Sequence, residues 1–168
     1  MITVVQADIT TLRVDAIVNA ANEGLRGGGG VDGAIHRAAG PELLHELQQH
    51  ASCPTGSAVL TKGYRLPAKY VIHAVGPIWQ DGNSGEAPLL ASAYENAFAC
   101  ARSRRDIRRI AFSAISTGVY GYPKDAAATI AVGVMRLHER DFDEVIACVF
   151  DDDNLAAYNR ELAAAEGR

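Results

Sequence analysis

Two asparagines, a run of glycines and one aspartate stand close together near the N-terminus, in the segment NAANEGLRGGGGVDG at 19–33. Four adjacent glycines are costly to order, so a fold keeps them where the backbone approaches something closely or where φ is positive. The run leads into an expected helix, whose N-terminal N–H groups and positive dipole end suit a phosphate. Asp32 would lie in the first turn of this helix and would repel a phosphate placed directly against it. We therefore expect Asp32 to face a neighbouring, uncharged part of the ligand.

A second glycine loop, STGVYG at 116–121, follows a buried strand expected at 108–115 and precedes a helix opened by Pro123. In open α/β sheets, ligands bind beyond the carboxyl ends of the strands. Two such loops at one edge could hold a diphosphate from opposite sides. Residues 28–33 also satisfy G-x-G-x-x-G, but this match is weak because any glycine run produces it. The sequence lacks G-x-x-x-x-G-K-[ST], so it does not support a P-loop.

Strand-like and helix-like segments alternate along the chain, without an internal repeat or a linker. Apolar residues at 31, 35, 38 and 39, for example, have the spacing of one helix face. The alternation predicts a three-layer α/β/α sandwich around a largely parallel sheet, and the length predicts a single domain over residues 1–168. The expected strands are 2–6, 15–19, 57–61, 70–75, 108–115 and 144–150, and the expected helices begin near 31, 41, 89, 123 and 154.

The composition gives no general pull toward nucleic acid or membranes, because the net charge is −4. The N-terminal residues MITVVQADIT favour a strand over a signal peptide, and no apolar run is long enough for a membrane span. Cys53, Cys100 and Cys148 lack C-x-x-C spacing, which argues against a disulfide framework or a zinc site. We therefore expect a cytoplasmic protein whose thiols are small buried hydrophobes.

Five motifs occur in order along the chain: QADIT at 6–10, DAIVNAAN at 15–22, LRGGGGVDGAIHRAAG at 25–40, HAVGP at 73–77 and ISTGVYGYP at 115–123. A weaker match is CVFDDDN at 148–154. Together they resemble a macrodomain of the MacroD type. The resemblance implies a mostly parallel, mixed six-stranded sheet and binding of ADP-ribose. It also implies removal of mono-ADP-ribose from acidic side chains of proteins and deacetylation of O-acetyl-ADP-ribose.

The resemblance further implies where the ligand would bind. Asp8 would accept a hydrogen bond from the adenine amino group, and Phe150 would lie against the adenine ring. The second glycine loop would hold the diphosphate through backbone N–H groups, and Tyr120 would cover the distal ribose. From the residues alone, Asp8 could instead cap a turn, and Phe150 could belong to the core. The expected ligand-binding residues are Asp8, Ile9, Ala20, Asn22, Gly28, Gly29, Gly30, Val31, Asp32, Ser116, Thr117, Gly118, Val119, Tyr120 and Phe150.

Asn22 and Asp32 match the pair that the family uses at the distal ribose, so they are the expected catalytic residues. Asn22 would bind ribose hydroxyls, and Asp32 would stabilise the positive charge that builds at the anomeric carbon. Either Asp32 or the substrate's own phosphate could activate water. From the residues alone, Asp32 could equally serve only the helix dipole. We expect Asn19 to tie the loop together, and we expect His73 to be a satisfied core histidine.

The resemblance implies neither a metal nor a redox cofactor, since the sequence lacks the Cys/His loop of the zinc-dependent macrodomains linked to sirtuins. Lys124 is expected to be a solvated residue at a helix start. Two other functions stay open: a reader that binds ADP-ribose without turnover, and a phosphatase acting on ADP-ribose 1″-phosphate. The basic cluster ARSRRDIRR at 101–109 could contact RNA, although it is more typical of a solvated helix end. The expected partners are ADP-ribose, its derivatives and mono-ADP-ribosylated proteins, with no membrane.

Overall fold

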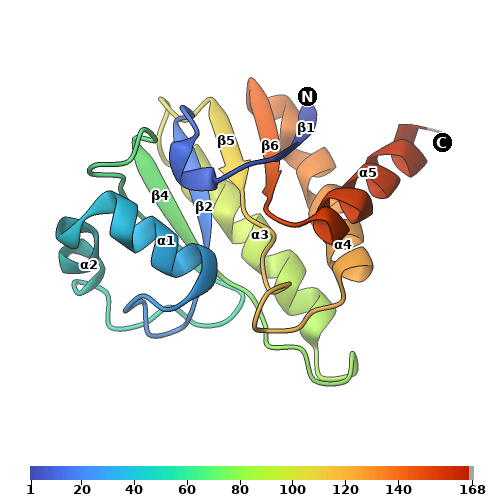
Figure 1. The fold of residues 1–168 in the computed structure, drawn as a ribbon, viewed down its shortest axis with the longest axis horizontal. Helices are drawn as coiled ribbons and strands as arrows, with labels where there is room; N and C mark the ends of the chain where they lie inside the picture. The colour runs from blue at the N-terminus through green and yellow to red at the C-terminus, as the bar shows by residue number, and fades with distance from the viewer. Residues whose placement is uncertain (167–168) are drawn as a thin grey trace.

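The computed structural model describes residues 1–166 of the chain. At its centre is a six-stranded sheet in the order β1-β6-β5-β2-β4-β3 (Figure 1). Neighbouring strands pair parallel except for β3 and β4, which pair antiparallel at one edge. The predicted mostly parallel, mixed sheet is therefore confirmed. The strands are β1 (Ile2–Gln6), β2 (Ala16–Ala21), β3 (Ala58–Lys62), β4 (Tyr70–Val75), β5 (Arg109–Phe112) and β6 (Glu144–Val149).

Helices cover both faces of the sheet and complete three layers. Helices α1 and α2 pack on one face, and α3, α4 and α5 pack on the other (Figure 1). The predicted α/β/α sandwich is thus confirmed. The helices are α1 (Gly30–Ala39), α2 (Pro41–Leu47), α3 (Glu86–Arg102), α4 (Lys124–His138) and α5 (Asp152–Glu166), with the short 3-10 helices η1 (Ile9–Thr11) and η2 (Glu139–Asp141). None of the helices described is long and apolar enough to cross a bilayer.

Strand β2 runs through the middle of the sheet and sends alternate side chains into two cores. Ala16 and Val18 face the core under α3, α4 and α5, whereas Ile17 faces the core under α1 and α2. Because both faces are covered, this part of the strand is a continuous apolar run. Asn19, further along the same strand, is the exception, since its polar side chain is completely buried.

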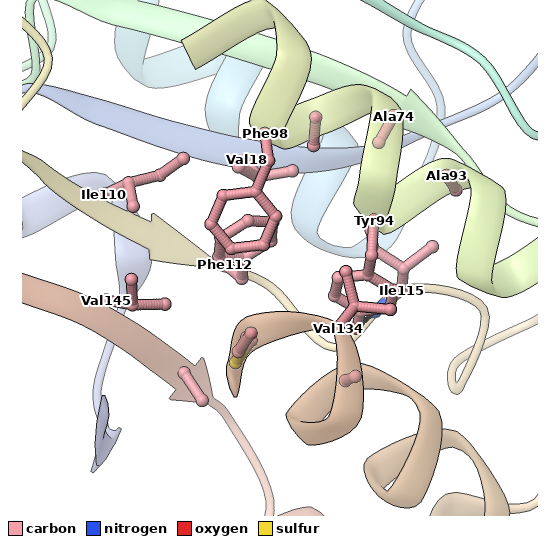
Figure 2. Packing of buried hydrophobic residues seen from close by; sticks show 14 of the residues in the cluster. Val18, Ala74, Ala93, Tyr94, Phe98, Ile110, Phe112, Ile115, Val134 and Val145 are labelled. Atoms are coloured by element: carbon pink, nitrogen blue, oxygen red, sulfur yellow. Dashed lines mark hydrogen bonds between the residues drawn. The ribbon is translucent and has the colours of Figure 1, made fainter. Parts of the chain in front are cut away.

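Aromatic side chains in the larger core anchor the start of the loop between β5 and α4 (Figure 2). Phe112 of β5 packs against Phe98 and Tyr94 of α3, with ring centroids 4.9 Å and 5.5 Å apart. The Ile115 backbone N–H donates a hydrogen bond to the Tyr94 hydroxyl at 3.3 Å. The loop that follows Ile115 therefore starts from a well-packed position.

Several element boundaries differ from the prediction, and three of the differences have a clear local reason. Strand β2 extends to Ala21, because it pairs with β4 as far as Val75. Strand β5 ends at Phe112 rather than at residue 115, because its pairing with β2 and β6 ends there. Helix α3 begins at Glu86 rather than at residue 89, because the Glu86 carboxylate accepts backbone N–H groups of the loop before it.

Candidate functional site

A cavity of about 720 Å³ lies at the carboxyl ends of β2, β5 and β6, the edge where open α/β sheets bind ligands. Two loops line it: the first glycine loop, residues 22–29, follows β2, and the second glycine loop, residues 116–121, lies between β5 and α4. The structure thus brings the two loops to one cleft. Every residue predicted for the site is on its wall, namely Asp8, Ile9, Ala20, Asn22, Gly28, Gly29, Gly30, Val31, Asp32, Ser116, Thr117, Gly118, Val119, Tyr120 and Phe150.

Helix α1 begins at the cavity wall. Its N-cap residue is Gly29, so no side chain caps the first N–H groups of the helix. These groups and the positive end of the helix dipole suit an anion. A Cβ at Gly33 would lie 2.5 Å from the carbonyl oxygen of Gly28. This close approach, which only glycine permits, packs the first glycine loop onto the helix.

Asp32, in the first turn of α1, is buried at the cavity wall. Its Oδ1 accepts a hydrogen bond from Asn19 Nδ2 at 2.7 Å and lies 3.4 Å from His36 Nε2. Its Oδ2 lies 3.3 Å from the position that a Cβ of Gly28 would occupy. One carboxylate oxygen is therefore held by protein groups, and the other lies beside a glycine that lines the cavity.

Asn22 lies near the same glycine, with its Nδ2 3.4 Å from the position of a Gly28 Cβ. The Nδ2 group donates to the Gly27 carbonyl at 3.1 Å, and the Oδ1 atom accepts from the Leu25 N–H at 3.1 Å. The side chain therefore shapes the first glycine loop. An amide carries a second N–H and a second lone pair, so these bonds leave capacity for a ligand hydroxyl.

A buried chain of hydrogen bonds continues from Asp32 into the sheet. Asn19 Nδ2 also lies 3.2 Å from His73 Nδ1, and His73 Nε2 lies 3.0 Å from Thr61 Oγ1. Since an amide nitrogen only donates, His73 Nδ1 accepts, and the neutral ring carries its proton on Nε2. Burial, assisted by the nearby His36, lowers the pKa of His73 to about 3. His73 is a satisfied core histidine, as expected. Asn19 bonds Asp32 and His73 instead of tying the glycine loop together, so that prediction is wrong.

The second glycine loop is closed by its own backbone. Tyr122 N donates to the Ser116 carbonyl at 2.9 Å, and Gly121 N donates to the Gly118 carbonyl at 3.0 Å. Ser116 has a φ of 69° and is buried. Ser116 packs closely against Gly76, because a Cβ added at Gly76 would stand 2.2 Å from Ser116 Oγ. The loop is therefore a compact turn set against the end of β4.

Tyr120, in the second glycine loop, is half-buried and lines the cavity. Burial, followed by the charges of Glu23 and Asp32, raises the pKa of its hydroxyl. The preceding residue, Val119, is 98% exposed. The loop tip thus faces solvent, while Tyr120 lines the cavity.

Asp8, Ile9 and Phe150 form another part of the wall. Asp8 Oδ1 accepts hydrogen bonds from Thr10 N at 3.0 Å and from Thr10 Oγ1 at 2.7 Å, so the residue does cap a turn. Ile9 is buried, whereas Phe150 is 85% exposed. Phe150 is therefore no core residue, and it lines the cavity.

A polar group on the wall near Phe150 escaped the sequence analysis. Lys124 Nζ lies 2.6 Å from Asp151 Oδ2, and Asn154 Nδ2 donates to Asp151 Oδ1 at 2.7 Å. The hydrogen bond with Asp151 raises the pKa of Lys124. Lys124 does begin α4, but the prediction that it is merely solvated is wrong, because it pairs with Asp151 across the cavity wall. The cavity wall also includes residues that the sequence analysis did not name as ligand-binding, namely Ala7, Ala21, Ala34, Gly76, Ser113, Ala114, Ile115, Cys148 and Val149.

A family model described as Macro domain matches residues 18–131. The chain belongs to the macro domain family. A macro domain-containing protein of Chlorobaculum tepidum is 56% identical to this macro domain over 167 residues, which cover 98% of this chain and 96% of that protein. A Klebsiella pneumoniae protein named O-acetyl-ADP-ribose deacetylase is 52% identical over 168 residues, which cover 96% of this chain and 95% of that protein.

A solved structure leads to the same family. It is a variant of the Oceanobacillus iheyensis macrodomain with ADPR, and it superimposes on this macro domain with a TM-score of 0.90 and 39% sequence identity. The match covers 98% of this chain and 93% of that one. The family that the sequence motifs resemble and the three-layer fold are therefore both confirmed.

Proposed function

We propose that this macro domain is an ADP-ribose-binding hydrolase that removes mono-ADP-ribose from acidic side chains of proteins, deacetylates O-acetyl-ADP-ribose, or does both. The observation that carries the proposal is the buried Asp32 on the cavity wall, with Oδ1 bonded to Asn19 and Oδ2 beside Gly28. A module that only binds has no need of this carboxylate, because its negative charge repels the ligand's phosphates. The relative named O-acetyl-ADP-ribose deacetylase and the solved macrodomain with ADPR support the proposal.

In this proposal ADP-ribose extends along the whole cavity. The adenine lies beside Asp8 with Phe150 against its ring. The diphosphate lies between the N-terminus of α1 and the second glycine loop, whose N–H groups and dipole suit its charge. The distal ribose then lies at Asn22 and Asp32, with Tyr120 over it.

The chemistry follows from the position of Asp32. As the acidic side chain departs from C1″ of the distal ribose, positive charge builds on the sugar, and the adjacent carboxylate stabilises it. Water forms the new bond to C1″, and its proton passes to Asp32 Oδ2 or to a phosphate oxygen of the ligand. The products are ADP-ribose and the restored acidic side chain. General-base assistance of this kind contributes about 10²- to 10⁴-fold to a rate.

Calorimetric titration with ADP-ribose, followed by release of labelled ADP-ribose from a modified protein, tests the proposal on one sample. We expect binding and release, both unaffected by a chelator. Binding without release would identify a reader instead. Release of phosphate from ADP-ribose 1″-phosphate, with the protein label retained, would identify a phosphatase. A protein that does not bind ADP-ribose would contradict the proposal altogether.

A further inference from the structure

Glu86, the first residue of α3, is a buried carboxylate outside the cavity wall. Its Oε2 accepts three backbone N–H groups, from Gln80, Asp81 and Gly82, at 3.0–3.1 Å. Its Oε1 accepts a fourth, from Ser84, at 2.7 Å. Burial would raise the pKa of Glu86, but these N–H donors outweigh it and lower the pKa to about 2. One ionised side chain therefore organises residues 78–85, which we call the Trp79 loop.

The Trp79 loop contacts the second glycine loop in two ways. The Trp79 backbone N–H donates to the Tyr120 carbonyl at 2.8 Å. The Trp79 ring packs on the ring of Tyr122, with centroids 4.8 Å apart and planes tilted by 59°. Gly82 lies over the other part of the indole, since a Cβ there would stand 2.9 Å from Trp79 Cη2. The indole is thus held between its own loop and the residue that closes the second glycine loop.

We propose that Glu86 and Trp79 are positioning residues that hold Tyr120 in its ligand-covering place. In the part of the chain that the structure describes, neither Glu86 nor Trp79 lines the cavity. Both residues would therefore act through the second glycine loop. The connection runs from the Glu86 carboxylate through the backbone of the Trp79 loop to the Tyr120 carbonyl. The identity of the ligand, ADP-ribose, rests on the proposed function. The contact between the Trp79 loop and the second glycine loop is independent of that function.

The Trp79 loop should affect the affinity for ADP-ribose without affecting the rate of the chemical step. Asn22 and Asp32 belong to the first glycine loop and to α1, and the hydrogen bonds given for their side chains go to Asn19, Leu25 and Gly27, none of which lies in the Trp79 loop. Loosening the Trp79 loop should therefore weaken retention of the ligand while the reacting groups stay in place. We expect a higher Kd for ADP-ribose and a higher KM, with kcat little changed.

The variant Glu86→Gln tests the proposal directly. Glutamine replaces one carboxylate oxygen by an NH₂ group, which then faces backbone N–H donors and repels them. We expect amide hydrogen exchange at residues 116–122 to quicken without ligand, and the affinity for ADP-ribose to fall by about 2- to 30-fold. Glu46→Gln is the matched control, because Glu46 also accepts a backbone N–H but does so from Lys62, away from the cavity.

Gly82→Ala perturbs the Trp79 ring while Glu86 stays unchanged. This variant tests the proposal if Glu86→Gln fails to fold. The added methyl would collide with the Trp79 ring, so we expect the same faster exchange and weaker binding. Gly85→Ala is its control, since this residue has a similar positive φ of 78° but nothing within 4 Å of the added methyl. Trp79 is the sole tryptophan of the chain, so ADP-ribose should also change the tryptophan fluorescence of the parent protein.

Parent-like exchange at residues 116–122 in Glu86→Gln or, where that variant does not fold, in Gly82→Ala would overturn the proposal. So would faster exchange accompanied by unchanged affinity. A rise in KM that is matched by an equal loss of kcat would also count against it, because the Trp79 loop would then control the chemistry. If the parent protein does not bind ADP-ribose, the proposed function fails, and the exchange measured without ligand still decides whether the two loops are coupled.

Discussion

Asn19 Nδ2 lies 2.7 Å from Asp32 Oδ1, and both side chains are buried. Asn19 belongs to the central strand β2, whereas Asp32 belongs to α1. The second contact of the same amide, with His73 of β4, uses its remaining N–H. Asn19 therefore ties the Asp32 carboxylate of α1 to two strands of the central sheet.

Asp32→Ala should abolish most turnover while ADP-ribose still binds. The substitution removes the group that stabilises developing charge and assists water, which is worth about 10²- to 10⁴-fold in rate. It also removes a negative charge near the ligand's phosphates, so affinity should stay the same or increase. Label release and calorimetry on the same variant check both expectations. Turnover equal to that of the parent would refute the role of Asp32.

Asn19→Ala should reduce both stability and turnover. The substitution leaves buried Asp32 Oδ1 and His73 Nδ1 without the donor that they share, which costs about 1–3 kcal/mol of unfolding free energy. The freed carboxylate can rotate, so kcat should fall although no ligand contact is lost. Denaturant unfolding and label release measure the two effects. A variant with lower stability and unchanged kcat would show that Asn19 supports the fold alone.

His73 should make the stability of the protein depend on pH. Its folded-state pKa of about 3 lies below the ordinary value of 6.5. Between these two pH values His73 is protonated in the unfolded chain and neutral in the folded protein. The contribution is complete above pH 6.5 and is lost as the pH falls toward 3, with a slope of at most about 1.4 kcal/mol per pH unit. His73→Gln, which keeps an acceptor and a donor, should flatten this dependence in acid unfolding. The exposed His45→Gln is the control, and an equal slope in both variants would exclude His73 as the cause.

The sequence predicts those parts of the site that come from a single continuous segment of the chain. The glycine run and Asp32 in the following helical turn belong to one stretch of chain, so their place relative to the α1 N-terminus follows from local rules. Contacts between distant segments are different. The pairs Lys124–Asp151 and Asn19–His73 form only because the sheet sets β5 beside β6 and β2 beside β4. No local pattern specifies that strand order.

The ion pairs of the basic cluster at 101–109 are likewise not predictable from local sequence. Its interpretation as an exposed helix end holds, since α3 ends at Arg102. Three arginines of the cluster are nevertheless paired, because Arg102, Arg108 and Arg109 form ion pairs with acidic residues between 141 and 144. Those acids lie in η2, between η2 and β6, and at the start of β6, and only the folded chain brings them near the arginines.

Gly33→Ala should weaken ADP-ribose binding and lower stability together. Its methyl would meet the Gly28 carbonyl oxygen at 2.5 Å, so the first glycine loop must move away from the α1 N-terminus. Gly133→Ala in α4 is the control, because nothing lies within 4 Å of its added methyl. The control should keep its affinity and gain about 0.5–1 kcal/mol of stability from helix propensity. Equal affinities in the two variants would mean that the first glycine loop does not shape the binding site.

Asp8→Asn should change which base the cavity prefers. Asp8 Oδ1 caps the turn at Thr10, and an asparagine oxygen can keep those bonds. The other carboxylate oxygen becomes an NH₂ group, which opposes the adenine amino donor but suits the carbonyl of hypoxanthine. We therefore expect the affinity for ADP-ribose to fall by at most about 1.5–3 kcal/mol, with little loss of stability, and the inosine analogue to be favoured relative to the parent. Calorimetry with both ligands measures the shift. A parallel loss for the two bases would place the adenine elsewhere in the cavity.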